Sequence, residues 1–240
     1  MVHGRGSCDE QFTDLAGQLE RHEIATVAIN LPGHGHSSTP PLTEPEHWTL
    51  KGLAGAVRAV VEHAQLKDFC LFGHSLGGLV ALEYGRRYPA PRQLITMGTH
   101  VELQSVADWK FALDLALRKW LGDGSLQEWY LRRLWRLTLA EWEELEYLRS
   151  EARRDWRRDV AILEQLNRRA DYRNVVKAMG RRMTLIRCQD DHIINADLGP
   201  SLRAVREAEG RVIELIGGHY SHLLDPRPLA TVLTGLLTNH

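Results

Sequence analysis

Short apolar segments alternate along this chain with segments whose apolar residues recur at helical spacing. Apolar residues at positions i, i+3, i+4 and i+7 mark one buried face of a helix, whereas a short continuous apolar run is typical of a buried strand. This alternation predicts an α/β fold, a mostly parallel sheet with helices on both faces. The predicted strands are residues 24–29, 69–72, 94–97, 184–187 and 212–215, and the predicted helices are residues 12–19, 50–64, 76–88, 198–208 and 226–237.

One long segment departs from the alternation. Between residues 101 and 178 no strand is predicted, and the apolar residues keep only helical spacing. We therefore expect residues 1–100 and 179–240 to form one core domain, into which residues 101–178 are inserted as a helical cap. We expect the tryptophans of this insertion to pack it against itself and the core, with one or two lining an apolar pocket: Trp109, Trp120, Trp129, Trp135, Trp142 and Trp156.

The segment Gly73-His74-Ser75-Leu76-Gly77 lies between a predicted strand and a predicted helix. In that context the pattern G-x-S-x-G holds a serine in a strained turn with its hydroxyl exposed, and the helix N-terminus behind it favours developing negative charge. The alternative is a glycine-rich turn with an incidental serine. Motif, strand and helix agree, which favours Ser75 as a nucleophile.

A serine nucleophile needs a base to take its proton and an acid to orient that base. His219 follows the last predicted strand, and His222, three residues further on, is the alternative base. Asp190 and Asp191 follow the fourth predicted strand, and both qualify chemically as the acid. The order serine, aspartate, histidine is that of the triad on folds of this kind. The opposing interpretation is that these are ordinary turn and loop residues.

These motifs together resemble the α/β-hydrolase superfamily, the serine esterases and lipases with a helical cap, over almost the whole chain. The resemblance implies Asp191 as the acid, since it stands before a short hydrophobic pair. It implies that the backbone N–H groups of Arg5 and Leu76 form an oxyanion hole, and that the cap sets substrate choice. The segments that carry it are His3-Gly4, Leu31-Pro32-Gly33-His34-Gly35, Gly73-His74-Ser75-Leu76-Gly77-Gly78, Asp190-Asp191 and Gly218-His219.

The N-terminus departs from the family pattern. In the family, the His-Gly pair ends a central strand preceded by an edge hairpin, whereas only Met1 and Val2 precede His3 here. That strand would lie between segments 24–29 and 69–72, where unpaired backbone groups are costly. We therefore expect N-terminal strands to be missing, and the natural protein to begin roughly 20 to 30 residues earlier.

The formal net charge of −1 gives no field that would concentrate nucleic acid or an anionic membrane at the surface. No long apolar run and no signal-like start are present, so we expect a cytoplasmic protein without a membrane segment. An arginine cluster could receive an acidic partner such as a carrier protein, although glutamates just upstream favour a solvated, salt-bridged face. The arginines are Arg149, Arg153, Arg154, Arg157 and Arg158, and the glutamates are Glu141, Glu143, Glu144 and Glu146.

We expect no cofactor and no metal. A metallohydrolase would rest on His34, His36 and the pair Asp191-His192, which is less than the ligand cluster such sites need. His34 and His36 are instead interpreted as solvated imidazoles at a Pro-Gly turn.

The expected function is therefore hydrolysis of a carboxylic ester or thioester of a small or medium acyl substrate, through an acyl-enzyme on Ser75. The first alternative is a carbon–carbon bond hydrolase or lyase that uses the same triad. The second is a non-catalytic binding protein on a hydrolase scaffold.

Overall fold

A computed structural model describes residues 1–103, 113, 116–117, 119–120, 125–134, 136–151, 156–166, 170–194 and 198–238. Its main sheet has four parallel strands in the order β1-β2-β5-β6. These are β1 (Cys70–His74), β2 (Gln93–Met97), β5 (Met183–Cys188) and β6 (Arg211–Leu215). In the register, Leu71 lies opposite Leu94 and Leu185 lies opposite Val212. Four of the predicted strands and the α/β class are thereby confirmed.

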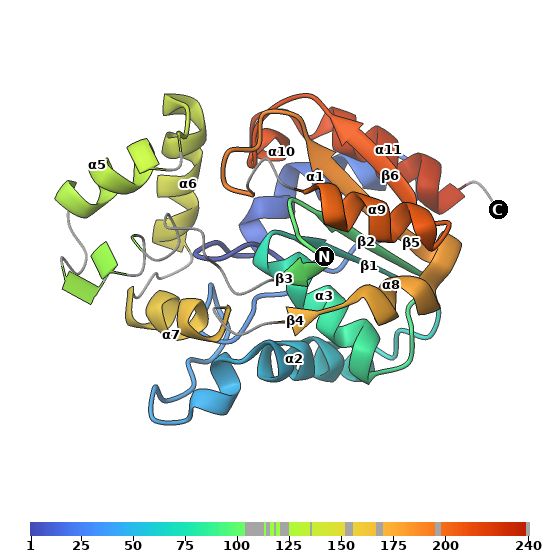
Figure 1. Cartoon of the computed structure of the whole chain (residues 1–240), viewed down its shortest axis with the longest axis horizontal. Helices are drawn as coiled ribbons and strands as arrows, with labels where there is room; N and C mark the ends of the chain where they lie inside the picture. Colours follow the sequence, from blue (N-terminus) through green and yellow to red (C-terminus); the bar gives the residue numbers. More distant parts are fainter. Residues whose placement is uncertain are drawn as a thin grey trace.

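Four of the described helices cover one face of the sheet (Figure 1). The leucines of the strands pack against these helices. Leu71 belongs to a core shared with α2 and α3, and Leu94 and Leu185 to a core shared with α3, α8 and α9. Thr49 begins α2, because its hydroxyl accepts from the N–H of Gly52. The helices of this face are α2 (Leu50–His63), α3 (Leu76–Arg87), α8 (Arg173–Met179) and α9 (Gly199–Glu207).

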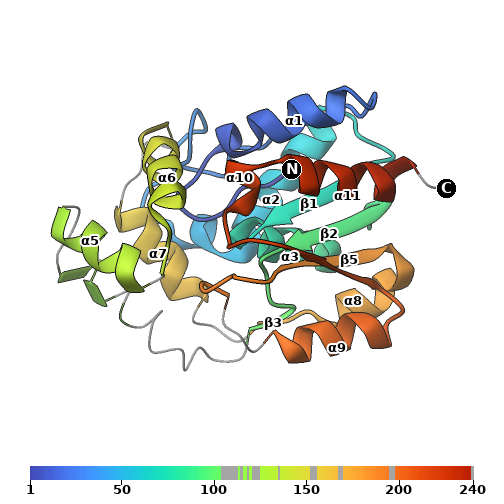
Figure 2. The ribbon, with the colours of Figure 1, turned by 90° about the horizontal axis from the view of Figure 1, so that it is seen from above.

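The opposite face is covered by α1 (Thr13–Glu20) and α11 (Arg227–Thr238), which run side by side in Figures 1 and 2. Their apolar residues pack on Phe72, Ile95 and Ile186, whose neighbours along each strand point to the other face. The predicted helices are thus present, with ends that differ from the expected ones by at most one residue.

Residues 24–29 do not form the predicted strand. Only Ile29 pairs, through a single parallel bridge to Val2, and Val2 bridges Gly73 on its other side. A strand requires a continuous ladder of backbone hydrogen bonds. In the described part of the sheet, this segment pairs only with Met1 and Val2: the N–H of Ile29 donates to the carbonyl of Met1, and the amino group of Met1 donates to the carbonyl of Val27. The apolar run therefore lies against the sheet as extended chain.

The insertion carries α5 (Ser125–Leu134), α6 (Leu139–Glu151) and α7 (Trp156–Leu166), which lie together beside the sheet in Figure 1. The prediction that it contains no strand is wrong, because β3 (Glu102–Leu103) pairs antiparallel with β4 (Ala170–Asp171). A two-residue ladder is too short to produce a periodic pattern in the sequence.

The inserted segment contacts the rest of the chain through short helical elements. α6 contacts the 3-10 turn η1 (Asp9–Phe12) and the helix α10 (Ser221–Leu224), whereas α7 contacts the turn η2 (Pro45–Trp48). A third turn, η3 (Gly180–Arg182), leads into β5. None of the described helices is long and apolar enough to cross a membrane.

The cap tryptophans do not behave alike. Trp142 is buried beside Ile193, as expected of a packing residue. Trp120 is 85% exposed and Trp129 is 50% exposed, so the packing prediction is wrong for both. Trp129 instead contacts Tyr130 and the guanidinium of Arg133 on its own helix. The side chains of Trp109, Trp135 and Trp156 lie outside the described part of the chain.

Two charged cap residues correct the interpretation of a solvated face. Glu141 is buried because it caps the start of α6 with Thr138. Arg158 is buried because its side chain lies over Gly33 and Trp48. Arg157 is exposed, as are Glu143, Glu144 and Glu146, and the side chains of Arg149, Arg153 and Arg154 lie outside the described residues.

Candidate active site

Ser75 stands at the turn between β1 and α3 with φ of 54° and ψ of −118°, a conformation that is rare for a residue with a side chain. Its N–H donates to the carbonyl of Met97 at 2.8 Å, and the hydroxyl of Thr99 donates to its carbonyl at 2.9 Å. A Cβ on Gly77 would collide with the carbonyl of Val2, and one on Gly78 with Thr99. The small residues around Ser75 are therefore required by close packing.

Asp191 and His219 form a hydrogen-bonded pair at the ends of β5 and β6. The distance between Asp191 Oδ2 and His219 Nδ1 is 2.6 Å, and both side chains are almost wholly buried. The other carboxylate oxygen accepts from the N–H groups of Ile193 and Ile194, each at 2.9 Å. Burial acts to raise the pKa of Asp191, but His219 and these two N–H groups outweigh burial and lower the pKa.

This pairing fixes the tautomer of His219. A carboxylate can only accept, so Nδ1 carries the hydrogen and Nε2 keeps a lone pair. Nε2 of His219 is buried and has no hydrogen-bond partner among the described residues. A buried imidazole nitrogen with an available lone pair is suited to take a proton from a nearby hydroxyl.

Ser75, Asp191 and His219 all lie at the carboxyl edge of the sheet, because each follows the carboxyl end of a parallel strand. His74 links two of them: it directly precedes Ser75, and its Nε2 lies 2.9 Å from the carbonyl of His219. Gly98, just after β2, has φ of +60°, and a Cβ there would lie 2.9 Å from His219 Cε1. The imidazole of His219 is therefore held against the strand ends.

The alternative acid and the alternative base do not form this bonded pair. Asp190 is exposed, whereas Asp191 makes the bond to His219. His222 is buried beside His74, and its Nε2 lies 3.0 Å from the amide nitrogen of Gln11.

The segment His3-Gly4-Arg5 passes directly over the serine turn. A Cβ on Gly4 would lie 3.1 Å from His74 Nδ1 and 3.4 Å from Ser75 Cβ. Leu76 begins α3, so its N–H has no partner within the helix. Arg5 lies in the turn that follows Gly4. The two backbone groups expected to bind an oxyanion therefore belong to segments on either side of Ser75.

His3 holds this loop in place. Its Nε2 accepts from the N–H of Leu31 at 3.1 Å, and its Nδ1 donates to the carbonyl of Gly4 at 2.7 Å. Burial, assisted by the neighbouring His34, lowers the pKa of His3 to about 3. His34 is itself buried against His3, with ring centroids 5.0 Å apart, so the prediction of a solvated imidazole is wrong for His34. It holds for His36, which is exposed.

The ligands suggested for a metal do not come together. Among the described residues, the only group of three side chains close enough to share an ion is Glu44, Glu46 and His47, all exposed. His34, His36 and the pair Asp191-His192 form no such group in that part of the chain.

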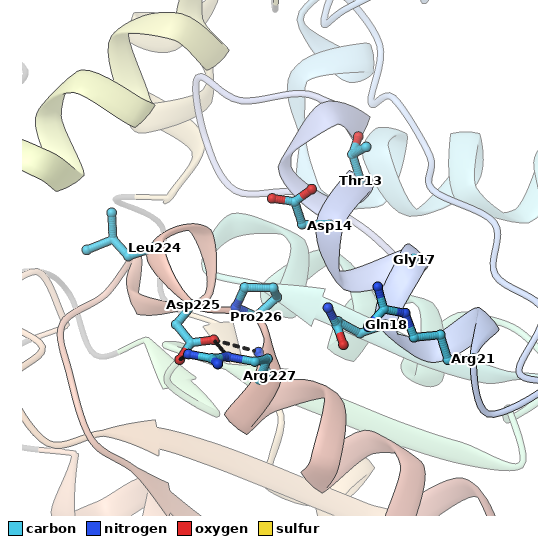
Figure 3. Close-up of a pocket in the computed structure, with 9 residues that line it drawn as sticks. All are labelled: Thr13, Asp14, Gly17, Gln18, Arg21, Leu224, Asp225, Pro226 and Arg227. Atoms are coloured by element: carbon cyan, nitrogen blue, oxygen red, sulfur yellow. Dashed lines mark hydrogen bonds and ion pairs between the residues drawn. The ribbon is translucent and has the colours of Figure 1, made fainter.

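A surface pocket of about 420 Å³ lies away from these residues. Figure 3 shows it between one side of α1 and the segment Leu224–Arg227. Its charged pair, Asp225 and Arg227, is exposed and mutually bonded at 2.7 Å. Ser75, Asp191 and His219 are not among its lining residues, so the chemistry of buried groups locates the candidate site better than the shape of this pocket.

The sequence does not predict how several residues beside the candidate site are bonded. Gln11, His74 and His222 form a buried hydrogen-bonded group beside Ser75 and His219, and Thr99 holds the carbonyl of Ser75. Gln11 is adjacent to a predicted apolar helix face, and nothing in its spacing distinguishes it. His222 was visible only as the alternative base.

The chain is similar to known hydrolases along its length. A protein of Enterobacter cloacae named "Putative carbamate hydrolase RutD" is 24% identical over 241 residues, which cover 97% of this chain and 88% of that protein. Two solved structures share the fold. An esterase from Thermogutta terrifontis has a TM-score of 0.79 at 18% identity, covering 98% of this chain and 87% of that one. A hydrolase from Pseudomonas aeruginosa PA01 has a TM-score of 0.80 at 17% identity, covering 99% and 89%.

The model of the alpha/beta hydrolase family matches residues 1–232, nearly the whole chain. Because the match spans both the sheet and the segments that carry Ser75, Asp191 and His219, fold and site fall within a single family. The chain belongs to the alpha/beta hydrolase family.

Proposed function

We propose that this protein is a serine hydrolase that cleaves a carboxylic ester or thioester of a small or medium acyl substrate. The observation that carries the proposal is the buried His219, whose Nδ1 is bonded to Asp191 and whose Nε2 has no partner among the described residues. It lies at the same sheet edge as a serine in a strained turn. That arrangement supplies a base, its orienting acid and a nucleophile.

In the first half of the reaction, Ser75 Oγ attacks the substrate carbonyl carbon, and the hydroxyl proton moves to His219 Nε2. Asp191 stabilises the resulting imidazolium. The carbonyl oxygen becomes an oxyanion, which the N–H groups of Leu76 and Arg5 stabilise by about 3 kcal/mol each when aligned. Collapse of the tetrahedral intermediate expels the alcohol or thiol, which takes the proton from His219 and leaves an acyl group on Ser75.

In the second half, a water molecule gives its proton to His219 Nε2 and attacks the acyl carbon. The second tetrahedral intermediate breaks its bond to Ser75 Oγ, which recovers the proton from His219. The products are the carboxylic acid and the regenerated enzyme. No step requires a metal or a cofactor.

The similarity to RutD favours carbamates as a second substrate class, because the name of that relative refers to carbamate hydrolysis. A carbamate carbonyl can be attacked by the same serine, so it belongs in the substrate panel. Carbon–carbon bond cleavage and binding without catalysis are the competing functions that the same panel addresses.

The first test uses the Ser75→Ala variant. We expect wild-type protein to hydrolyse p-nitrophenyl esters of graded acyl length and to be labelled by a fluorophosphonate probe. The variant should lose both activities and keep the wild-type melting temperature, because the triad acts as a unit. Turnover that persists in the purified variant would remove Ser75 from the mechanism, and wild-type protein that is neither active nor labelled would favour a binding protein.

Two neighbouring aspartates provide a matched control for the same assay. Asp191→Asn should lower kcat on the order of 10³-fold or more, because the amide cannot hold the imidazole in its working tautomer. Asp190→Asn makes the same chemical change on an exposed side chain and should have little effect. The opposite ranking would assign the acid to Asp190.

A further inference from the structure

Gln11 lies in the turn η1, at a place where three parts of the proposed active site converge. Its side chain is buried, and it contacts the backbone of Gly4, the ring of His74 and the ring of His222. The mechanism above uses none of these three contacts. Each of the three residues nevertheless lies close in sequence to a proposed active-site residue, since Gly4 precedes Arg5, His74 precedes Ser75, and His222 follows His219 by three residues.

The orientation of the Gln11 amide follows from its partners. The N–H of Gly4 can only donate, so the atom 3.2 Å away is the amide oxygen, Oε1. The amide nitrogen then faces His74 Nδ1 and His222 Nε2, each at 3.0 Å. Its two hydrogens point to two imidazole nitrogens, and both nitrogens must accept. All the hydrogen-bonding capacity on the nitrogen side of the amide is thereby used.

This orientation fixes the tautomers of two histidines. Since Nδ1 of His74 accepts, its hydrogen is on Nε2, which donates to the carbonyl of His219 at 2.9 Å. Since Nε2 of His222 accepts, its hydrogen is on Nδ1. Burial, followed by the neighbouring histidines, lowers the pKa of His74 well below its usual range, and burial followed by His219 lowers the pKa of His222 to about 3. Both rings are therefore neutral. His74 bonds through both ring nitrogens, whereas Nδ1 of His222 has no hydrogen-bond partner among the described residues.

The group of Gln11, His74 and His222 joins three loops from distant parts of the sequence: the oxyanion loop at Gly4, the turn at Ser75 and the loop that carries His219. Gln11 fastens the oxyanion loop through Gly4, and His74 fastens the base loop through the carbonyl of His219. The rings of His74 and His222 lie 4.4 Å apart, and those of His74 and His219 lie 4.7 Å apart. Reversing the hydrogen on His74 would place a lone pair against the His219 carbonyl, which weakens the hold on the base.

We propose that Gln11 is a positioning residue of the active site, which sets the tautomers of His74 and His222 and so holds the oxyanion loop and the His219 loop in place beside Ser75. Its catalytic consequence rests on the proposed function. The tautomers do not, because they follow from the contacts alone.

The decisive variant is Gln11→Glu, which keeps the size and the acceptor for Gly4 but removes both donated hydrogens. A neutral His74 must then carry its hydrogen on Nδ1 to bond the carboxylate, and its bond from Nε2 to the His219 carbonyl is lost. We expect kcat for a p-nitrophenyl ester to fall on the order of 100-fold, since displacements of about 1 Å have that effect. KM should remain near the wild-type value, because no contact to substrate is removed.

Gln18→Glu is the matched control. It makes the same amide-to-carboxylate change in the next helix, on a partly exposed side chain that lines the surface pocket of Figure 3. Its kcat and KM should equal those of the wild type. A Gln11→Glu variant that keeps wild-type kcat would overturn the positioning role.

A second measurement does not depend on activity or on the stability of a variant. Nitrogen-15 spectra of the wild-type imidazoles, assigned by the loss of signals in His74→Gln and His222→Gln, report which ring nitrogen carries hydrogen. We expect hydrogen on Nε2 of His74 and on Nδ1 of His222. Hydrogen on the other nitrogen of either ring would refute the proposal. An inactive wild type with the expected tautomers would instead contradict only the proposed hydrolysis.

Discussion

Gly98 is the residue whose replacement most directly probes the placement of the base. It follows β2, has φ of +60°, and its N–H donates to the carbonyl of Ile186 at 3.2 Å. A Cβ at this position would lie 2.9 Å from Cε1 and 3.0 Å from Nδ1 of His219, and 3.3 Å from Oδ2 of Asp191. No methyl group fits there without a shift of the imidazole. Glycine therefore serves both the backbone and the site.

For Gly98→Ala we expect kcat for ester hydrolysis to fall on the order of 100-fold, because the added methyl displaces His219 from Ser75. The positive φ adds a loss of about 1 kcal/mol in the free energy of unfolding. Steady-state kinetics and urea titration of the same preparation measure the two effects separately.

Gly180→Ala isolates the effect of the backbone. Gly180 has φ of +53°, but the nearest atom to an added Cβ is the carbonyl oxygen of Ala208 at 3.6 Å. The Gly180→Ala variant should lose about as much free energy of unfolding as Gly98→Ala and should keep the wild-type kcat. Equal kcat losses in the two variants would show that strain, and not contact with His219, limits position 98.

Some residues of the candidate site can be predicted from the sequence, and others cannot. The motif around Ser75 predicts a nucleophile at this position because the strained turn needs small neighbours in a fixed local pattern. His34, Glu141 and Arg158 were expected in solvent and are buried. Their burial depends on partners distant in the chain, such as His3 for His34, which no local pattern encodes. Gln11 is unpredictable for the same reason.

Among the elements, α3 and the segment before α8 are joined by a buried carboxylate. Glu83 of α3 accepts from the hydroxyl of Tyr172 at 3.1 Å and pairs with Arg86 at 2.5 Å and with Arg87. Burial, followed by the charge of Glu83, raises the pKa of Tyr172. The arginines are partly exposed, so water can replace their partner, whereas the Tyr172 hydroxyl has no such access.

Glu83→Leu should therefore lower the free energy of unfolding by about 1 to 3 kcal/mol, chiefly through the unsatisfied Tyr172 hydroxyl. Adding Tyr172→Phe should recover part of the loss, because the donor is then removed as well. The control is Glu209→Leu, which breaks an exposed pair with Arg181 that is expected to contribute little. Urea unfolding compares the variants, and equal losses for Glu83→Leu and Glu209→Leu would contradict a structural role for the buried group.

The elements themselves were largely predictable. The strands at β1, β2, β5 and β6 and the helices around them follow from apolar periodicity, because burial of one face imposes it. Residues 24–29 have the same apolar character as those strands but lack a ladder, and pairing is a property of two segments. β3 and β4 are too short to leave any pattern.

Across the whole molecule, buried neutral histidines link folding to pH. The pKa of His3 and that of His222 are lowered to about 3, and that of His74 well below its usual range, in each case first by burial. In the unfolded chain these side chains take up protons near pH 6.5. Between about pH 6.5 and pH 3 the unfolded state therefore binds more protons than the folded state, and stability falls as the pH falls.

Each of these histidines should contribute a slope of roughly 1 kcal/mol per pH unit below pH 6.5, and almost none above pH 7.5. Asp191 has a lowered pKa and loses its contribution only as the pH falls below about 4. Urea titrations from pH 5.0 to 8.0 measure the slope. His63→Gln, a change to an exposed histidine, should leave it unaltered. A free energy of unfolding that stays constant from pH 7 to pH 5 would contradict the neutral buried histidines.

Glu141 in the cap packs against Gly218 in the core, so the residue at one position restricts the residue at the other. One of its oxygens bonds the N–H and hydroxyl of Thr138 at the start of α6, and the other lies where a Cβ of Gly218 would stand, one residue before His219. The cap is therefore not an interchangeable module. A chimera that receives a foreign cap would bring a different residue to position 141, next to Gly218 in the loop of His219. We therefore expect such a chimera to fit only when positions 141 and 218 are transferred together, and we expect the two positions to coevolve.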